Sequence, residues 1–114
     1  MTQEDKDLLL KDLSARLRYG VKVHIETLPN TPHTLDEFIL WVIRTKDDEI
    51  VKPYLRPLSS MTSSEKGWYD RLRSSTIAYA ALIDWLNENH FDYRGLIEKG
   101  LAIEITKENN PYKE

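Results

Sequence analysis

Leucines recur at helical spacing in the first segment of the chain, residues 2–19. On a period of 3.6 residues, four of them fall within an arc of about 100° and form one apolar face. Thr2 followed by Asp5 resembles a capping box, and Gly20 can adopt the left-handed conformation that ends many helices. The pattern predicts an amphipathic helix that docks on a sheet through its leucine face. The four leucines are Leu9, Leu10, Leu13 and Leu17.

Apolar and polar residues alternate in residues 21–26, which predicts a strand with one face in water. Turn-forming residues at positions 29–32, two of them prolines, are expected to break this strand. The run 37–44 has apolar residues at both odd and even positions, so a strand here would be apolar on both faces. This is typical of a central or doubly covered strand. We therefore expect Trp41, within this run, to be buried.

Weaker signals complete the predicted sheet. Residues 46–49 predict a polar turn, and residues 50–51 predict a short third strand that ends at Pro53, because proline lacks a backbone donor. The prolines and paired serines of residues 53–60 predict an extended or irregular connector. Alternation in residues 101–106 predicts a final strand that returns to the sheet.

Two further helices are predicted in the second half of the chain. The segment 62–65, Thr-Ser-Ser-Glu, matches a capping box and begins a helix. Whether that helix continues through residues 74–76 is left open, because Ser-Ser-Thr is a weak helix former that could equally cap a new helix. An apolar stripe in residues 77–89 predicts the next helix, with Trp85 buried. Residues 92–100 predict a tight turn and a short helix ended by glycine.

These elements together predict an α+β fold, in which a small, mainly antiparallel sheet of three to four strands packs against two main helices plus a short C-terminal helix. The length of 114 residues, with 40% hydrophobic and 31% charged residues, suits a single soluble domain. We place this domain at residues 1–106. Residues 107–114 form a polar tail that we expect to fray.

Composition excludes several classes of function. Because the chain has no cysteine, disulfides, thiolate catalysis and cysteine-containing zinc sites are ruled out. No stretch approaches the roughly 20 apolar residues of a membrane span or resembles a signal peptide, so we expect no membrane association and a cytoplasmic location. The net charge is −3 and the cations are scattered, which disfavours nucleic-acid binding because that affinity needs clustered cations.

Residues that could hold a metal or a cofactor show no supporting pattern. His24, His33 and His90 do not have metal-ligand spacing, and the glycines match no nucleotide-binding motif. Asp84 and Glu88 lie four residues apart on one predicted helix, where neighbouring carboxylates form a solvated face rather than an acid-base pair across a cleft. We therefore expect neither a metal nor a cofactor.

The segment His90-Phe91-Asp92-Tyr93-Arg94 gathers an imidazole, a carboxylate, a phenol and a guanidinium. One interpretation is an acid-base or anion-binding site, with His90 as proton carrier and Arg94 as anion clamp. The other is structural: the histidine complements a helix dipole, Asp92 caps the next turn, and Tyr93 packs. The sequence favours the structural interpretation, because clustered ionisable groups also occur in purely structural networks.

Aromatic residues suggest a binding surface. Trp68 and Tyr69 follow Gly67 in a polar predicted helix, where an indole can fall outside the core stripe. Exposed aromatics and arginines are enriched in interfaces. The alternative is that Trp68 only covers the helix junction. The candidate surface for a protein partner consists of Tyr54, Arg56, Trp68, Tyr69 and Arg71.

Three segments also resemble a known group of sequences. They are DLLLKDLSARL (residues 7–17, followed by Gly20-Val21), KPYLRPLSSMT (52–62) and HFDYRGLI (90–97, continuing to 100–102). They resemble small hypothetical proteins from gut anaerobic bacteria and their prophages. The resemblance covers about half of the chain and departs from the pattern in residues 22–49 and around Trp68. It implies a mobile-element setting and carries over no catalytic residue.

Three functional hypotheses follow from the sequence. The first is a noncatalytic interaction or accessory protein of phage or prophage origin that binds a protein partner. The second is a small enzyme or anion-binding protein that uses His90, Asp92 and Arg94. The third is a nucleic-acid-associated protein. The lack of a catalytic constellation favours the first hypothesis, while the identity of the partner and the oligomeric state stay open.

Overall fold

The computed structural model describes residues 1–46, 48–75 and 77–112, and for residues 29–31 it describes the backbone alone. The described residues form α-helices, short 3-10 helices (η) and a four-stranded mixed sheet, which confirms the predicted α+β class. In chain order the elements are α1 (Gln3–Arg16), η1 (Leu17–Tyr19), β1 (Lys22–Ile25), β2 (Leu28–Thr34), α2 (Glu37–Thr45), β3 (Val51–Leu55), η2 (Leu58–Ser60), α3 (Ser63–Arg73), α4 (Tyr79–Glu88) and β4 (Ile103–Glu104).

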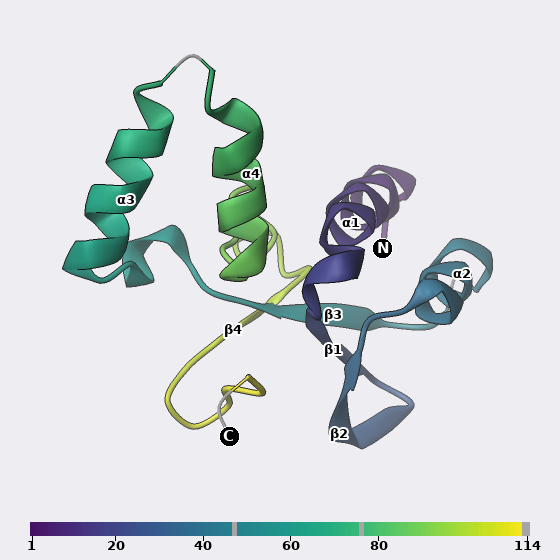
Figure 1. Ribbon diagram of the computed structural model, residues 1–114. Helices are drawn as coiled ribbons and strands as arrows, with labels where there is room; N and C mark the ends of the chain where they lie inside the picture. Colours follow the sequence, from purple (N-terminus) through teal and green to yellow (C-terminus); the bar gives the residue numbers. More distant parts are fainter. Residues whose placement is uncertain (47, 76, 113–114) are drawn as a thin grey trace.

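The sheet has the strand order β2-β1-β3-β4. β1 pairs antiparallel with both β2 and β3, whereas β3 and β4 run parallel. The sheet is therefore mainly antiparallel, as the sequence predicts. In Figure 1, α1 and α2 lie on one side of the sheet, while α3 and α4 form a helical hairpin whose second helix contacts α1. The C-terminal segment lies on the other side of the sheet.

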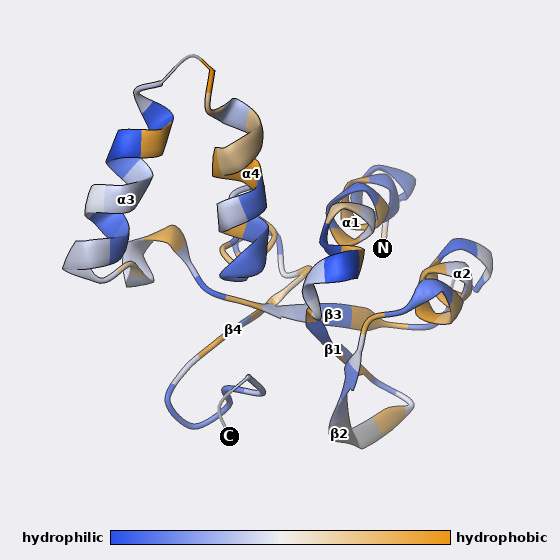
Figure 2. Cartoon of the chain, viewed as in Figure 1, coloured by the Kyte–Doolittle hydropathy of each residue, from blue (hydrophilic) through white to orange (hydrophobic). Residues whose placement is uncertain are grey.

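The main core lies between α1, α2 and the sheet. Leu9 and Leu13 of α1 have no exposed surface, which confirms the centre of the predicted leucine face. In β1, Val23 is buried and His24 lies on the outer face, as the alternation predicts. In Figure 2, α1 contains both hydrophobic and hydrophilic residues, whereas α3 is mostly hydrophilic. The buried residues of this core are Leu9, Leu13, Val21, Val23, Ile25, Leu35, Ile39, Leu40, Ile43, Val51, Leu55, Leu96, Leu101 and Ala102.

A second, smaller core joins α3 to α4 and to the segment after α4. Leu82, Leu86 and Phe91 are its buried residues, and Phe91 has no exposed surface. Because α3 itself contains no buried residue, it depends on this shared cluster for its place in the fold. The partly buried residues around the cluster are Met61, Tyr69, Leu72, Ile83, Trp85 and Tyr93.

The segment predicted as a central strand is the helix α2, so that prediction was wrong. Asp36 caps this helix: its Oδ1 accepts the Ile39 N–H at 2.9 Å. Apolar residues at both parities fit a strand covered on both faces, but they also fit a short helix. In the helix Trp41 turns outward with 49% of its surface exposed, so the expected burial of this tryptophan was also wrong.

The predicted turn at residues 29–32 is part of the strand β2, which is a second correction. β2 pairs with β1, and the hairpin turns at Glu26 and Thr27. Prolines are tolerated there because β2 is an edge strand of the sheet, with one side of its backbone unpaired. His33, next to the predicted turn, also lies on this strand, opposite Val23.

Strand β3 continues beyond Pro53, where the sequence predicted its end. Pro53 lies opposite Val23 in the antiparallel pairing with β1, and the strand ends at Leu55. The predicted irregular connector therefore begins later and contains the 3-10 helix η2. β3 takes a central position because β4 pairs on its other side.

The capping box at the start of α3 is confirmed. The Thr62 hydroxyl accepts the Glu65 N–H at 3.2 Å, and the Glu65 carboxylate accepts the Thr62 N–H at 2.9 Å. α3 ends at Arg73 with Ser74 as its C-cap, and α4 begins at Tyr79, so the two are separate helices. Thr76 lies outside the described residues.

The predicted short C-terminal helix is instead a series of turns, a further correction. The Asp92 carboxylate accepts the N–H groups of Leu96 and Ile97, at 2.8 and 2.9 Å, and Gly100 has a left-handed φ of 74°. Because the carboxylate binds these two donors, the chain turns without continuing as a helix. The predicted final strand is present as β4.

Tyr112 anchors the described part of the C-terminal tail to the sheet. The Tyr112 hydroxyl accepts the Lys22 N–H at 2.8 Å and donates to the Tyr54 carbonyl at 2.9 Å. Fraying of the tail stays a prediction, and residues 113–114 lie outside the described part. Within the described ranges of the chain, no helix combines the length and the apolar character needed to cross a membrane.

Candidate functional site

Two of the five residues predicted for partner binding lie side by side on α3. Trp68 has 46% of its surface exposed, and the Arg71 guanidinium lies over its ring at 5.5 Å from the centroid. This spacing suits a cation–π contact at the surface. Because Arg71 supports one face of the indole, the other face can receive a ligand.

The other three predicted residues do not join this pair. Tyr69 turns toward the second core. The Arg56 guanidinium binds the Glu65 carboxylate at 2.7 and 2.9 Å and covers the Phe91 ring at 4.2 Å. Tyr54 lies on β3. The five residues thus form no continuous surface, and Arg56 and Tyr69 hold the α3–α4 hairpin in place.

Trp68 instead lines a groove with residues that the sequence did not single out for binding. The groove has a volume of about 630 Å³ and receives Tyr19 from η1 and Trp85 from α4. Trp85 is only half-buried, a correction to its expected burial: its ring packs on Phe91 at 5.5 Å. We call this site the aromatic groove. It consists of Arg18, Tyr19, Trp68, Leu72, Ala81, Asp84, Trp85 and Glu88.

A hydrogen-bonded triad forms one wall of the aromatic groove. The Asp84 Oδ1 accepts the Tyr19 hydroxyl at 2.5 Å and an Arg18 N–H at 3.1 Å. The hydrogen bond from Tyr19, followed by the charge of Arg18, lowers the pKa of Asp84. The same bond raises the pKa of Tyr19, because the phenol donates to a carboxylate. The triad joins η1 to α4 and so fixes the two sides of the groove that α3 does not supply.

The residues of the segment 90–94 do not converge on one site. Asp92 is committed to the backbone turn described above. Arg94 donates to the Asp12 carboxylate at 2.9 Å, and the Tyr93 hydroxyl donates to the Asn87 side chain at 2.9 Å. Arg94 also donates to the Tyr93 hydroxyl at 3.1 Å, and Asp92 and Tyr93 line one pocket of about 480 Å³. His90 stacks on Tyr112 instead and does not line this pocket, so the four side chains do not assemble as one acid-base site.

A buried ionic network, which the sequence analysis missed, lies behind this segment. Asp12 and Arg16 have no exposed surface, and the Arg16 Nε donates to Asp12 at 2.8 Å. The Arg16 Nη2 also donates to the Phe91 carbonyl at 2.6 Å. Arg94 donates to the Asp12 carboxylate as well, so this carboxylate binds two arginines. The signal was available, because the i,i+4 spacing of Asp12 and Arg16 places both beside the leucine face of α1.

His90 lies in a constrained and half-buried position. Its φ is 61°, and its ring stacks on Tyr112 with centroids 3.8 Å apart and planes 10° apart. Among the described residues, its Nδ1 is buried without a hydrogen-bond partner. Burial first, and then the charges of Arg16 and Arg56, lower the pKa of His90 from 6.5 to about 4. A neutral imidazole at neutral pH is a packing group here rather than a proton carrier.

We expect acid to destabilise the fold through His90. Because the pKa is lowered in the folded state, the stabilisation is complete above pH 6.5 and is lost as the pH falls toward 4. The loss should be about 1–2 kcal/mol, since solvent still screens part of the ring. Urea unfolding followed by circular dichroism at several pH values measures it.

The variant His90→Asn separates this effect from other titrations, because asparagine tolerates the left-handed backbone. The free energy of unfolding of this variant should depend less on pH than that of the wild type between pH 6.5 and 4.5. Glu65 does not affect the comparison in this pH range. Its hydrogen bond to Arg56 lowers its pKa from 4.5 to about 2, so the stability that Glu65 contributes is lost only below pH 4.5. An equal slope for both proteins would contradict the assignment to His90.

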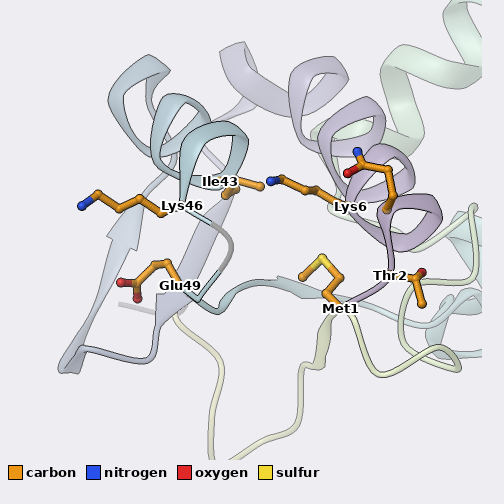
Figure 3. A pocket seen from close by; sticks show the side chains of 7 residues that line it. Met1, Thr2, Lys6, Ile43, Lys46 and Glu49 are labelled. Carbon is orange, nitrogen blue, oxygen red and sulfur yellow. The ribbon is translucent and has the colours of Figure 1, made fainter.

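A further pocket, of about 280 Å³, lies between the start of α1 and the end of α2. Figure 3 shows Lys6 extending toward Ile43, while Lys46 and Glu49 point away from the opening. Its charges do not converge as an acid-base or anion site would require.

Within the described part of the chain, no group of three or more histidine, aspartate or glutamate side chains could hold a metal ion. Compared with protein-family models, curated proteins and solved structures, the chain matches none of them. The aromatic groove and the buried network are therefore interpreted from their own geometry.

Proposed function

We propose that this protein is a noncatalytic interaction protein that binds a protein partner through the aromatic groove. The supporting observation is that Trp68, Trp85 and Tyr19, from three different elements, line one groove at the surface. Aromatic side chains with apolar bodies and polar edges dominate the energy of protein interfaces. The partner should insert an apolar side chain between the two indoles.

The groove is organised before any partner arrives. Arg71 covers one face of Trp68, and Asp84 holds Tyr19 and Arg18 together. Preorganised side chains lose little conformational entropy on binding, so more of the contact energy remains as affinity. This supports a binding role rather than the alternative that Trp68 only covers the helix junction.

The two alternative functions have less support. A small enzyme that uses His90, Asp92 and Arg94 needs these side chains to meet at a cleft, and each has a separate partner instead. A nucleic-acid-associated protein needs a cationic surface, whereas the net charge is −3 and the groove contains Asp84 and Glu88. A phage or prophage origin remains a proposal that rests on the sequence resemblance.

Quantitative affinity capture from a lysate of the source organism tests the proposal. Trp68→Ala, alone and combined with Arg71→Ala, should lower recovery of the specific partner by about 30-fold, the effect of losing a central interface tryptophan worth roughly 2 kcal/mol. The partner recovered with the wild type is then titrated as a purified protein, so that affinity rather than abundance is compared.

The matched control is Tyr79→Ala, which removes another exposed aromatic of the same hairpin, 69% exposed and outside the groove. It should leave the affinity within about two-fold of the wild type. Circular dichroism checks that each variant is folded. If the Trp68 variants keep full affinity, or if Tyr79→Ala weakens binding equally, the aromatic groove is not the binding site.

A further inference from the structure

Helix α2 is apolar on both of its sides. Ile39, Leu40 and Ile43 face the main core, as described above. On the outer side, Phe38 is 67% exposed and Trp41 49% exposed, and their rings stack with centroids 5.9 Å apart. Two adjacent exposed aromatic rings on a nine-residue helix form a surface that water solvates poorly.

A pocket of about 180 Å³ opens beside the Phe38 ring. Leu28, at the start of β2, forms part of its edge with 54% of its surface exposed. The surface therefore carries both a protruding indole and an apolar hollow that could receive one. The pocket is lined by Ile25, Thr27, Leu28, Phe38, Ile39, Val42, Lys46, Glu49 and Val51.

The charges on the outer side of α2 are arranged symmetrically about Trp41. Glu37 lies in the first turn and Arg44 in the last turn. Their i,i+7 spacing places them on the same side, about 10 Å apart along the helix axis, with Trp41 between them. Neither has an ion-pair partner among the described residues.

We propose that this surface binds a second copy of the same chain, so that two α2 helices pack antiparallel about a twofold axis near Trp41. In a twofold interface every contact occurs twice: if one residue of the first copy contacts a second residue of its partner, the same pair also meets with the two copies exchanged. An antiparallel pair therefore places Glu37 of each copy beside Arg44 of the other and brings the two Trp41 indoles to the centre, next to the apolar hollows.

Self-complementarity favours a second copy over an unrelated partner. The rim of the pocket adds one more cation and one more anion, Lys46 and Glu49, so the surface is locally balanced although the chain has a net charge of −3. Two like-charged copies can meet on a balanced surface without repulsion. The dimer uses different elements from the aromatic groove, so it stands independently of the proposed function.

Sedimentation equilibrium of the purified full chain, from about 1 µM to about 1 mM, tests the proposal in the range where small interfaces associate. The wild type should dimerise within this range. Trp41→Ala should weaken the dimer at least about ten-fold, as expected for a central tryptophan. Trp68→Ala is the matched control, because it removes an equally exposed indole elsewhere and should leave the dimer unchanged.

Charge reversal tests the antiparallel arrangement itself. Glu37→Arg and Arg44→Glu should each weaken the dimer, because each places like charges together across the axis. The combined variant should return to within about three-fold of the wild-type affinity, since the pairs are restored in reverse. Circular dichroism confirms that α2 survives each change. A monomer throughout the range would overturn the proposal and assign the surface to a different partner, and a dimer that neither reversal weakens would overturn it as well.

Discussion

Replacing Asp12 with asparagine is expected to lower the free energy of unfolding by about 3–5 kcal/mol. Asp12 has no exposed surface and accepts hydrogen bonds from both Arg16 and Arg94. Asparagine keeps the shape but removes the charge, so the fully buried Arg16 guanidinium loses its counterion and stays out of water. Urea unfolding followed by circular dichroism measures the change.

The matched control is Asp7→Asn on the same helix, where the carboxylate is exposed and should contribute within about 0.5 kcal/mol. The double variant Asp12→Leu with Arg16→Met should lose less stability than the sum of the two single changes, because it removes both buried charges together. Equal urea midpoints for Asp12→Asn and the wild type would contradict the importance of the network.

Phe91→Ala should destabilise the fold by a similar amount, about 3–5 kcal/mol, because it leaves a cavity in the second core. The Phe91 ring has no exposed surface and lies between the Arg56 guanidinium, 4.2 Å from its centroid, and the Trp85 ring. Because α3 has no buried residue of its own, the α3–α4 hairpin should loosen first. Urea unfolding measures the loss of stability. Hydrogen exchange of the amides in α3 and α4 tests whether the hairpin loosens first.

The comparison variant is Phe38→Ala, studied at a protein concentration low enough to exclude association. Phe38 is 67% exposed, so the change should stay within about 0.5 kcal/mol. Retained wild-type stability in Phe91→Ala would mean that the second core collapses onto the vacated space at little cost. Faster exchange in α1 and β1 than in the hairpin would contradict the predicted order of loosening.

Part of the candidate site was accessible from the sequence. Trp68 and Arg71 were identified because an indole in a polar helix stands out locally, and the structure places them together. Tyr19 and Trp85 were missed, since nothing in their local patterns indicates that η1 and α4 approach α3. The grouping of Tyr54 and Arg56 with Trp68 was not confirmed, because Arg56 is held by Glu65 instead.

The sequence by itself determined the elements whose signals are local. The leucine period of α1, the alternation of β1 and the capping box at Thr62 and Glu65 each depend on residues within a few positions of one another. Side-chain spacing and backbone capping act over one or two turns, so these elements could be predicted without knowing what they pack against.

Only the tertiary structure decided the rest. The apolar run that forms α2 fits a strand covered on both faces as well as a short helix. The sheet and α1 bury just one stripe of this helix, which leaves Trp41 outside. The hydrogen bonds from Arg16 to Phe91 and from Arg94 to Asp12 join residues 75 and 82 positions apart. Such contacts depend on which distant segments share a core, and a local pattern of polar and apolar residues does not carry that information.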